Sequence, residues 1–563
     1  MNFDSVPFPL DTSFQLWLTV FGSATLIVLI VSLLATVASL GSRGLGVFAN
    51  ELGAMLGDFV SISPRRVFAL AQLTFREAYR RKALMVFVVF AILLMFAGWF
   101  LTSSNLQPEF QVKVYVSFVL RALSWLVLPV VLLLACWGIP EDIRLRSMHT
   151  VVTKPARRLE IVLGRMLGFS FIGLLVLTAM ATVGGFWIRR QLPAEAQAQL
   201  ICRQPISGEL SFRDREGNDK DEQGEALKQG INVGDIWLFH SFIEGATKAR
   251  AVWTFDDVGP DVLDAEGNLL LENRFQAFRS HKGDMKRSIY FQYIFFNPET
   301  GVRAPYDLKT VEENRGRTDR IPRKFASVSG TGGITDRKTY DLIEDLVTKN
   351  GQLTVEVACV DPGQYLGMAR PDLFIRTTDL PFESGYIKAV VCIALMLLVV
   401  TFIGVSVSTF VKGPVATFLT FVIVIVSYSA RDFMGTIIGD PDALAKAKQY
   451  SGMQEMKKLD GGGVLESIYR ILTHMNPTTE LPAGPATAVM KTIDTGMVNF
   501  LWLVYRILPN FDYFTKSQLY VANGFDVPFN PSVLGCLMIT LAYFIPCVIL
   551  GYFALRVREL EAK

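Results

Sequence analysis

Long apolar segments alternate with charged ones along this chain. An α-helix crosses a bilayer with about 20 apolar residues, so each apolar run near that length predicts one membrane span. The pattern predicts seven spans, at about residues 14–40, 83–101, 114–139, 165–187, 386–410, 415–430 and 533–555. We therefore expect a polytopic α-helical membrane protein with about seven spans.

A second kind of pattern fills residues 189–385. This insertion is polar and rich in glycine, and it contains short segments in which apolar and polar residues alternate. Alternation at a period of two is typical of β-strands. The strand candidates are ARAVWTF, RSIYFQYIFF, GQLTVEVACV and DLFIRT, and turn sequences such as AEGN and NPETG lie between strand candidates. We predict an inserted all-β domain that resembles a β-sandwich.

Residues 64–82 predict an amphipathic helix before the second span. Ser63 and Pro64 favour a helix start, as a capping residue and a proline at the first helical position. At about 100° per residue, the apolar and basic side chains separate onto two arcs. We expect an elbow helix that lies on the membrane surface, with an amphipathic helix on a soluble core as the alternative. The residues that define it are Arg65, Arg66, Phe68, Phe75, Arg76, Tyr79 and Arg80.

Two further amphipathic segments, VLESIYRILTHM and MVNFLWLVYRIL, lie in the polar region 431–530. The second segment is shorter than a membrane span. We therefore expect it to lie in the membrane interface or to form half of a re-entrant hairpin.

The composition agrees with a membrane protein. Hydrophobic residues make up 51% of the chain and charged residues 19%, and the mean hydropathy is +0.35. The net charge is only +3 and the basic residues gather beside spans, so we expect no nucleic-acid partner. The predicted segments are an N-terminal span (1–45), a segment with the elbow helix (46–82), spans two to four (83–188), the β insertion (189–385), a span hairpin (386–430), a helical or re-entrant region (431–530) and the last span with its tail (531–563).

The segment 139–164 joins the third and fourth spans, and we call it the charged loop. Basic residues in short loops beside spans favour the cytoplasmic side of a membrane. Applied to each short loop, this rule predicts an outside N-terminus, a cytoplasmic C-terminus and an extracytoplasmic β domain. The membrane that we expect is a bacterial-type plasma (inner) membrane. The basic residues of the loop and its border are Arg144, Arg146, Lys154, Arg157, Arg158 and Arg165.

The charged loop is predicted to have two parts. Residues 141–152 can continue as a helix from the third span. Lys154 precedes Pro155, which disfavours the α conformation, so the chain should turn there and restart as the helix of the fourth span. This shape could act as a lever on both spans, and the alternative is a plain basic loop that only fixes the topology.

Motifs for catalysis and nucleotide binding are absent from the sequence. It contains no G-x-x-x-x-G-K-[ST], no G-x-S-x-G and no H-E-x-x-H, and its four histidines are scattered. We therefore predict no enzyme activity, no metal site and no cofactor in this chain.

Two of the six cysteines, Cys202 and Cys359, lie in the β insertion. If the insertion is extracytoplasmic, they could form a disulfide that joins its beginning to its end. The alternative is two free, buried thiols. The other four cysteines lie in predicted spans, where we interpret them as small packing residues.

The sequence TVVTKPARRLEIVLGRMLG resembles the cytoplasmic loop of type-2 ABC exporter permeases. In that family an acidic residue and a short helix precede a Lys/Arg-Pro-x-x-Arg turn, and a glycine and a basic residue open the next span. The matching residues are Glu141 or Asp142, Lys154, Pro155, Arg158, Gly164 and Arg165. The elbow segment is also similar to that family, as are the Lys412-Gly413-Pro414 turn and the tail with Arg556, Arg558 and Glu559.

The resemblance implies a six-helix exporter core with one extra N-terminal span, arranged as a homo- or heterodimer of permeases in the lipid bilayer. It also implies a separate ABC ATPase, which binds ATP and Mg and docks on a coupling helix at residues 141–152. The residues implied for ATPase coupling are Glu141, Asp142, Arg144, Arg146, His149, Lys154, Pro155 and Arg158. The large β insertion departs from many simple exporters of this type.

Together these features predict the permease subunit of an exporter that moves a hydrophobic or lipid-linked substrate outward. One alternative is a membrane-anchored extracytoplasmic binding or signalling protein, in which the spans only hold the β domain. Another is a non-transporting subunit that transmits ATPase strokes to this domain.

Overall fold

The chain folds into two compact units, one of β-strands and one of helices. The β unit is built on Ile201–Pro381, and the helical unit contains the segments before and after it. The predicted helical protein with an inserted β domain is confirmed in outline. The computed structural model describes residues 8–80, 85–101, 108–144, 157–220, 227, 229–231, 240–279, 288–311, 316–327, 338–441, 443–444, 463–476, 481–482 and 484–561.

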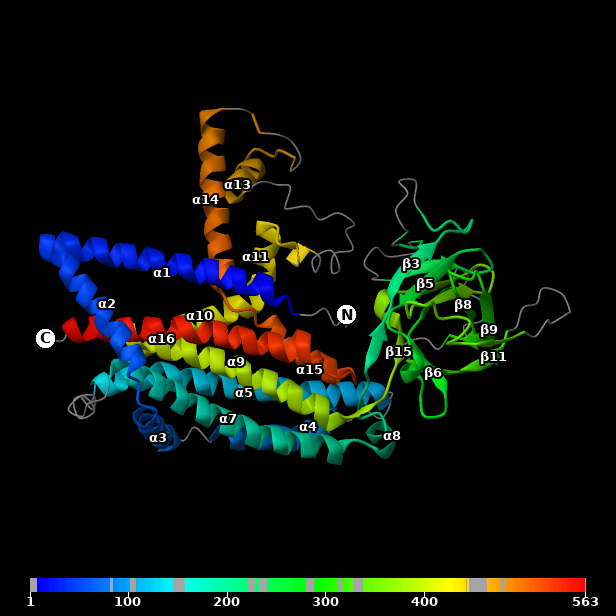
Figure 1. Cartoon of the computed structure of the whole chain (residues 1–563), viewed down its shortest axis with the longest axis horizontal. Coiled ribbons are helices and arrows are strands. Elements are labelled where there is room, and N and C mark those ends of the chain that lie inside the picture. Colours follow the sequence, from blue (N-terminus) through cyan, green and yellow to red (C-terminus); the bar gives the residue numbers. More distant parts are fainter. Residues whose placement is uncertain are drawn as a thin grey trace. The chain divides into compact units, whose positions relative to one another are not determined.

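The helical unit consists of long helices with short ones between them (Figure 1). The helices before the β unit are α1 (Leu10–Leu40), α2 (Gly44–Val60), α3 (Pro64–Arg80), α4 (Met85–Leu101), α5 (Pro108–Arg144), α7 (Arg158–Gln191) and α8 (Ala194–Gln197). Those after it are α9 (Phe382–Phe410), α10 (Gly413–Ile425), α11 (Arg431–Ile438), α13 (Val464–Leu472), α14 (Pro485–Ile507), α15 (Asp512–Ala522) and α16 (Gly535–Glu561). π-Helical stretches at Val426–Ala430 and Phe529–Leu534 adjoin α10 and α16.

Five helical segments of the described chain are long and apolar enough to cross a membrane. They are Pro108–Glu141, Arg158–Gln191, Phe382–Phe410, Gly413–Ile438 and Phe529–Leu555, and they coincide with the predicted third to seventh spans. The predicted first and second spans are helices, α1 and α4, but they are not among these five. Helices α2 and α3 meet at a bend of 82°, and this pair would make six spans if it counts as one broken span.

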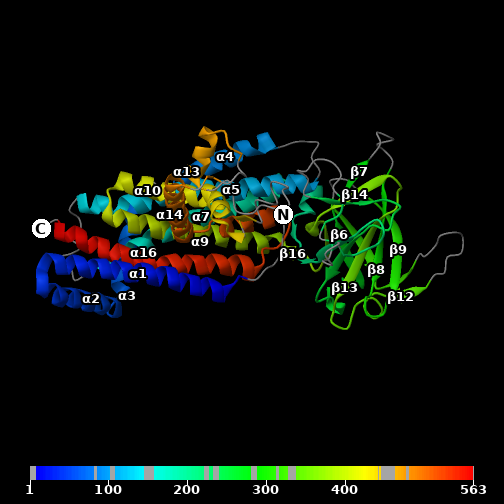
Figure 2. The ribbon, with the colours of Figure 1, turned by 90° about the horizontal axis from the view of Figure 1, so that it is seen from above.

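Helices α5, α7, α9 and α16 run side by side in both views (Figure 1 and Figure 2). Small residues allow close approach between them. A Cβ on Gly173 would lie 2.8 Å from a Val131 methyl group, and one on Gly184 would lie 2.6 Å from Val119. These two glycines of α7 therefore serve helix packing, as their small size suggests.

The helix ends differ from the predicted span ends. Arg189 and Arg190 mark the predicted start of the insertion, but they form the last turn of α7. Basic residues are favourable at a helix C-terminus, where the backbone carbonyls carry partial negative charge. Arg189 also forms an ion pair with Glu383 in the first turn of α9. The strands consequently occupy Ile201–Pro381 and not the whole of residues 189–385.

The region after the sixth span also differs from its prediction. The helix of that span continues through the π-helical turn and α11 to Ile438. Arg431, at the start of α11, donates hydrogen bonds to the carbonyls of Tyr505 and Leu508. The predicted amphipathic helix at MVNFLWLVYRIL is part of α14, which begins at Pro485 and has 23 residues.

The β unit consists of antiparallel sheets. The larger sheet has the order β3 (Glu209–Arg213), β5 (Arg250–Phe255), β13 (Leu353–Cys359), β8 (Tyr290–Phe296), β9 (Arg303–Thr310). A second sheet has the order β10 (Arg317–Pro322), β6 (Asn268–Asn273), β15 (Leu373–Arg376), β2 (Pro205–Ser207). Smaller sheets combine β4 (Ser241–Glu244), β14 (Gln364–Met368) and β7 (Gln276–Arg279), β11 (Lys324–Ala326) and β12 (Thr339–Asp341), and β1 (Ile201–Cys202) and β16 (Leu380–Pro381).

The four predicted strand sequences are confirmed as β5, β8, β13 and β15. The alternate residues of β13 that include Val355 and Val357 enter the core together with Trp253 and Phe295. The remaining residues of β13 are buried as well, among them Glu356. Both faces of this central strand are thus covered, which simple alternation does not predict.

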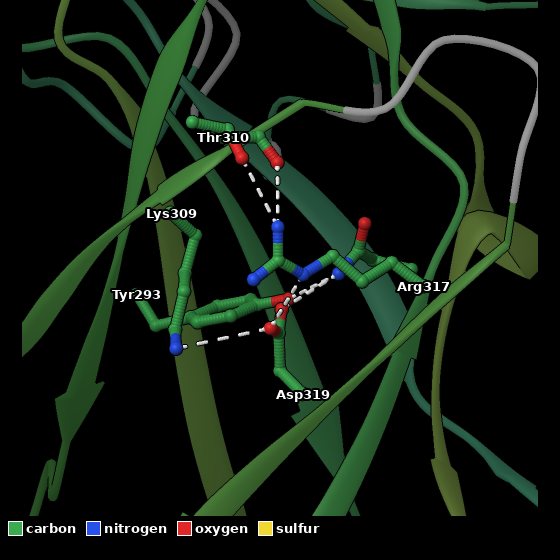
Figure 3. Close-up of polar contacts among 6 residues, drawn as sticks. Tyr293, Lys309, Thr310, Arg317 and Asp319 are labelled. Carbon is green, nitrogen blue, oxygen red and sulfur yellow. Dashed lines mark hydrogen bonds and ion pairs between the residues drawn. The ribbon is translucent and has the colours of Figure 1, made fainter.

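A buried polar network joins the two main sheets (Figure 3). Asp319 of β10 accepts hydrogen bonds from Asn273 of β6 (2.9 Å) and from the hydroxyl of Tyr293 of β8 (3.2 Å). Arg317 donates to Asp319 (3.0 Å) and to the Thr310 hydroxyl of β9 (3.0 Å). Burial and the Asp319 charge raise the pKa of Tyr293 well above its ordinary value, so its hydroxyl stays protonated and can donate.

We expect Asp319→Ala to lower the free energy of unfolding of the β unit by about 3–5 kcal/mol, because it removes the buried acceptor shared by Arg317, Asn273 and Tyr293. Hydrogen exchange of the full chain, followed in peptides from β6, β8 and β10, measures this loss. Asp307→Ala, at an exposed position of β9, is the control and should leave the exchange unchanged. Equal exchange in both variants would contradict the role of the network.

Candidate functional site

Two described helix ends lie within the charged loop. Helix α5 ends at Arg144 and α7 begins at Arg158. The predicted helical continuation from residue 141 is therefore present as far as residue 144, with Glu141, Asp142 and Arg144 in the last turn of α5. The other predicted coupling residues, except Arg158, lie outside the described residues; they are Arg146, His149, Lys154 and Pro155.

A buried carboxylate lies near the C-terminal end of this loop. Glu160 in the first turn of α7 has no exposed surface. One of its oxygens accepts the backbone N–H of Ser63 (2.9 Å), and the other accepts the backbone N–H of Arg157 (3.0 Å). The Arg66 guanidinium lies 3.5 Å from the second oxygen. We call these four residues the Glu160 junction.

The Glu160 junction connects the starts of two helices. Ser63 precedes α3 and Arg157 precedes α7, so the carboxylate lies at both N-termini. The first backbone N–H groups of a helix lack partners within it and carry partial positive charge, so a carboxylate is stabilising there. The Glu160 carboxylate should stay with these three partners, because losing them would leave a buried negative charge without compensation.

Helix α3 packs closely along α7 beyond the junction. A Cβ on Gly164 would lie 2.5 Å from the Leu70 side chain, and one on Gly168 would lie 2.5 Å from Thr74. Arg165, between these glycines, forms an ion pair with Glu77 of α3 at 2.6 Å. The two helices are thus held together by close packing and by charge.

Asp58, near the end of α2, links two further elements to the junction. The Arg157 guanidinium lies 3.4 Å from the Asp58 carboxylate and also donates to the Gly57 carbonyl. The Tyr552 hydroxyl of α16 donates to Asp58 at 3.0 Å. Helices α2, α3, α7 and α16 therefore meet near the loop.

The predicted amphipathic helix is present as α3, and one side of it packs on α7. Thr74 and Ala78 are fully buried against α7, so α3 is packed on a neighbouring helix along its length. Phe68 and Tyr79 are 72% and 59% exposed, and Phe75 contacts Phe171 of α7. Arg65, Arg66 and Arg76 lie on the exposed side, and α3 ends at Arg80. The predicted apolar arc thus divides into a packed part and an exposed part.

Cys202 and Cys359, the two cysteines of the β unit, are not joined by the disulfide considered above. Cys202 lies in β1, which pairs with β16, whereas Cys359 ends β13 of the five-stranded sheet. Both are buried, and burial raises the pKa of the Cys359 thiol to about 11. The thiolate is the reactive form of cysteine, and burial disfavours it at Cys359.

The described residues contain no group of three or more histidine, cysteine, aspartate or glutamate side chains that could hold a metal ion. This end of the helical unit holds fixed charges and closely packed helices near the C-terminal end of the charged loop.

We expect Glu160→Ala to accelerate hydrogen exchange at the backbone amides of Ser63 and Arg157 by about 100-fold. Removing one partner of a buried charge lowers the free energy of unfolding by about 3 kcal/mol or more, and this loss corresponds to a change of about that size. Exchange of the full chain in detergent, followed by mass spectrometry, measures it. The control is Glu195→Ala in the first turn of α8, where the carboxylate is exposed. A Glu160→Ala profile equal to that of the control would exclude the junction as a clamp.

We also expect Gly168→Ala to lower the stability of the helical unit by about 1–3 kcal/mol. The new methyl group would lie 2.8 Å from the backbone carbonyl of Ala71, which cannot move without shifting α3. The melting temperature in detergent should fall. Gly496→Ala in α14 meets no atom within 4 Å and should raise stability slightly, because alanine favours helix. No difference between the two variants would argue against close packing of α3 on α7.

No protein-family model matches this sequence, and no curated protein matches it. The resemblance to type-2 ABC exporter permeases therefore rests on the motif residues of the chain alone.

Proposed function

We propose that this chain is the membrane-spanning subunit of an ATP-driven exporter, which receives work from a separate ABC ATPase through the charged loop and moves a hydrophobic or lipid-linked substrate outward. The single observation that carries this proposal is the Glu160 junction, which lies near the C-terminal end of the loop and clamps two helix starts. The loop would face the cytoplasm, because its basic residues favour that side.

The junction supports the proposal because it can transmit force. A push on the loop reaches α7 at Arg157, whose backbone N–H is bound to Glu160. The same carboxylate binds the start of α3, and Arg165 binds Glu77 farther along. Force on the loop would therefore move α3 and α7 as one body instead of bending a loose connection.

The motor would be a partner protein. The sequence has no P-loop, so ATP and Mg would bind to the ATPase subunit, and the coupling residues of the loop would dock on it. A second permease subunit, identical or different, would complete the assembly in the bilayer. The exposed Phe68 and Tyr79 of α3 suit the membrane interface, where aromatic side chains are favoured.

A second candidate is an extracytoplasmic binding or signalling protein. The observation that favours it is the β unit, which has its own aromatic core and forms a separate compact unit. In this case the helices would only anchor the β unit. A non-transporting subunit that passes ATPase strokes to the β unit would combine both features.

The coupling proposal predicts that the double variant Arg144→Glu/Arg146→Glu loses a co-purifying ATPase, because it reverses two charges of the docking loop. Affinity purification of the full chain from its own membranes, with ATP turnover of the eluate, measures this. The matched control is Arg190→Glu, an exposed arginine at the opposite end of α7, which should retain the ATPase.

The outcomes separate the candidates. Absence of any ATPase with the unaltered chain, or its retention by the double variant, would refute coupling through the loop. With the ATPase bound, turnover in liposomes that rises with a hydrophobic substrate supports export. Turnover that no substrate changes would support the non-transporting subunit.

A further inference from the structure

Three arginines gather on the face of the five-stranded sheet that points away from the core. Residues directly opposite each other in paired strands, and residues two apart in one strand, share a face of a sheet. The cross-strand pairs on this face are Arg213 with Arg250, Val252 with Glu356, Glu356 with Ile294, and Phe296 with Arg303. Four of the five strands thus contribute an arginine or its acidic partner to one surface.

Glu356 is the centre of this cluster and is fully buried. Its two oxygens lie 2.6 Å from Arg213 Nη1 and 3.4 Å from Arg303 Nη1. The Arg303 guanidinium also lies over the Phe296 ring, 4.6 Å from its centroid. Its side chain is 49% exposed, so Arg303 can reach a ligand from solvent while Glu356 and Phe296 hold it in place.

Arg250 is held by the backbone and not by a carboxylate. Its Nη1 donates to the carbonyls of Thr247 and Ala249, both at 2.7 Å. Burial lowers the pKa of Arg250, and the nearby guanidiniums of Arg303 and Arg213 lower it further, although Glu356 acts in the opposite direction. The positively charged guanidinium groups of these arginines therefore repel one another. The hydrogen bonds and ion pairs described above hold the side chains in place despite this repulsion.

The positive charge of the three arginines exceeds the negative charge of Glu356. One carboxylate neutralises one of the three guanidiniums, and like charges opposite each other in paired strands destabilise a sheet. Glu209, on the same face of β3, lies four residues from Arg213, which is about 13 Å along a strand. Acidic residues outnumber basic ones in Ile201–Pro381 as a whole, so this excess of positive charge is local.

We propose that Arg213, Arg250 and Arg303 form a binding site for a phosphate-type oxyanion, either free or in a lipid head group. Guanidinium groups present several N–H donors in a plane, which matches the oxygens of phosphate. A bound oxyanion would relieve the repulsion between the arginines. This site is independent of the charged loop and of the transport proposal.

The test uses the full chain in a non-ionic detergent at low salt, with two probes in separate titration calorimetry experiments. One probe is inorganic pyrophosphate, and the other is dihexanoyl phosphatidylglycerol below its micelle concentration. The variants are Arg303→Gln and Arg303→Lys. The control is Arg320→Gln on β10 of the other sheet, where the side chain is 70% exposed and pairs with the equally exposed Glu266.

We expect at least tenfold weaker binding of the active probe by Arg303→Gln, intermediate binding by Arg303→Lys and unchanged binding by Arg320→Gln. Binding of pyrophosphate identifies a free phosphate ligand, and binding of the lipid probe alone identifies a head group. Failure of both probes to bind the unaltered chain, or equal weakening by Arg303→Gln and Arg320→Gln, overturns the proposal. Hydrogen exchange in β13 shows whether Arg303→Gln stays folded, and if it does not, the comparison of Arg303→Lys with Arg320→Gln decides.

Discussion

A buried carboxylate shared by two helix N-termini is the constraint on which this end of the helical unit depends. Glu160 has no contact with water, so protein groups must compensate its charge. These groups are the backbone N–H of Ser63, the backbone N–H of Arg157 and the guanidinium of Arg66. The first two belong to the starts of different helices. One side chain therefore fixes where α3 and α7 begin relative to each other, and the glycines of α7 allow the close packing that follows.

The β unit uses the same physical device where the chain enters and leaves it. Glu272 of β6 is 1% exposed and lies 3.3 Å from Arg203 and 3.7 Å from Arg376. Arg203 directly follows β1, and Arg376 ends β15, shortly before β16. Because β1 and β16 pair with each other, a single buried carboxylate binds both the incoming and the outgoing segment. A buried carboxylate thus holds the two ends of the β unit together, as Glu160 holds the starts of α3 and α7 together.

Local sequence patterns predict the helices and strands, whereas the Glu160 junction depends on contacts between residues that are distant in the sequence. Apolar length and alternation are properties of neighbouring residues, so they predicted α5, α7 and α9 as well as β5, β8 and β13. Glu160 accepts the backbone N–H of Arg157 three residues earlier, but its other partner, Ser63, lies 97 residues earlier, so no local pattern predicts the link between α3 and α7. Asp494 of α14 is a similar case, since it accepts the backbone N–H groups of Leu465 and Glu466 and so caps α13 from another helix. A carboxylate that caps a helix in a distant segment leaves no local motif.

Two of the boundaries between helices and strands differ in length. Helix α9 begins at Phe382, directly after β16 ends at Pro381, so no residue separates them. Residues 192–200, which include the short helix α8, separate α7 from β1. Helix α7, which begins within the charged loop, packs on α9 inside the helical unit.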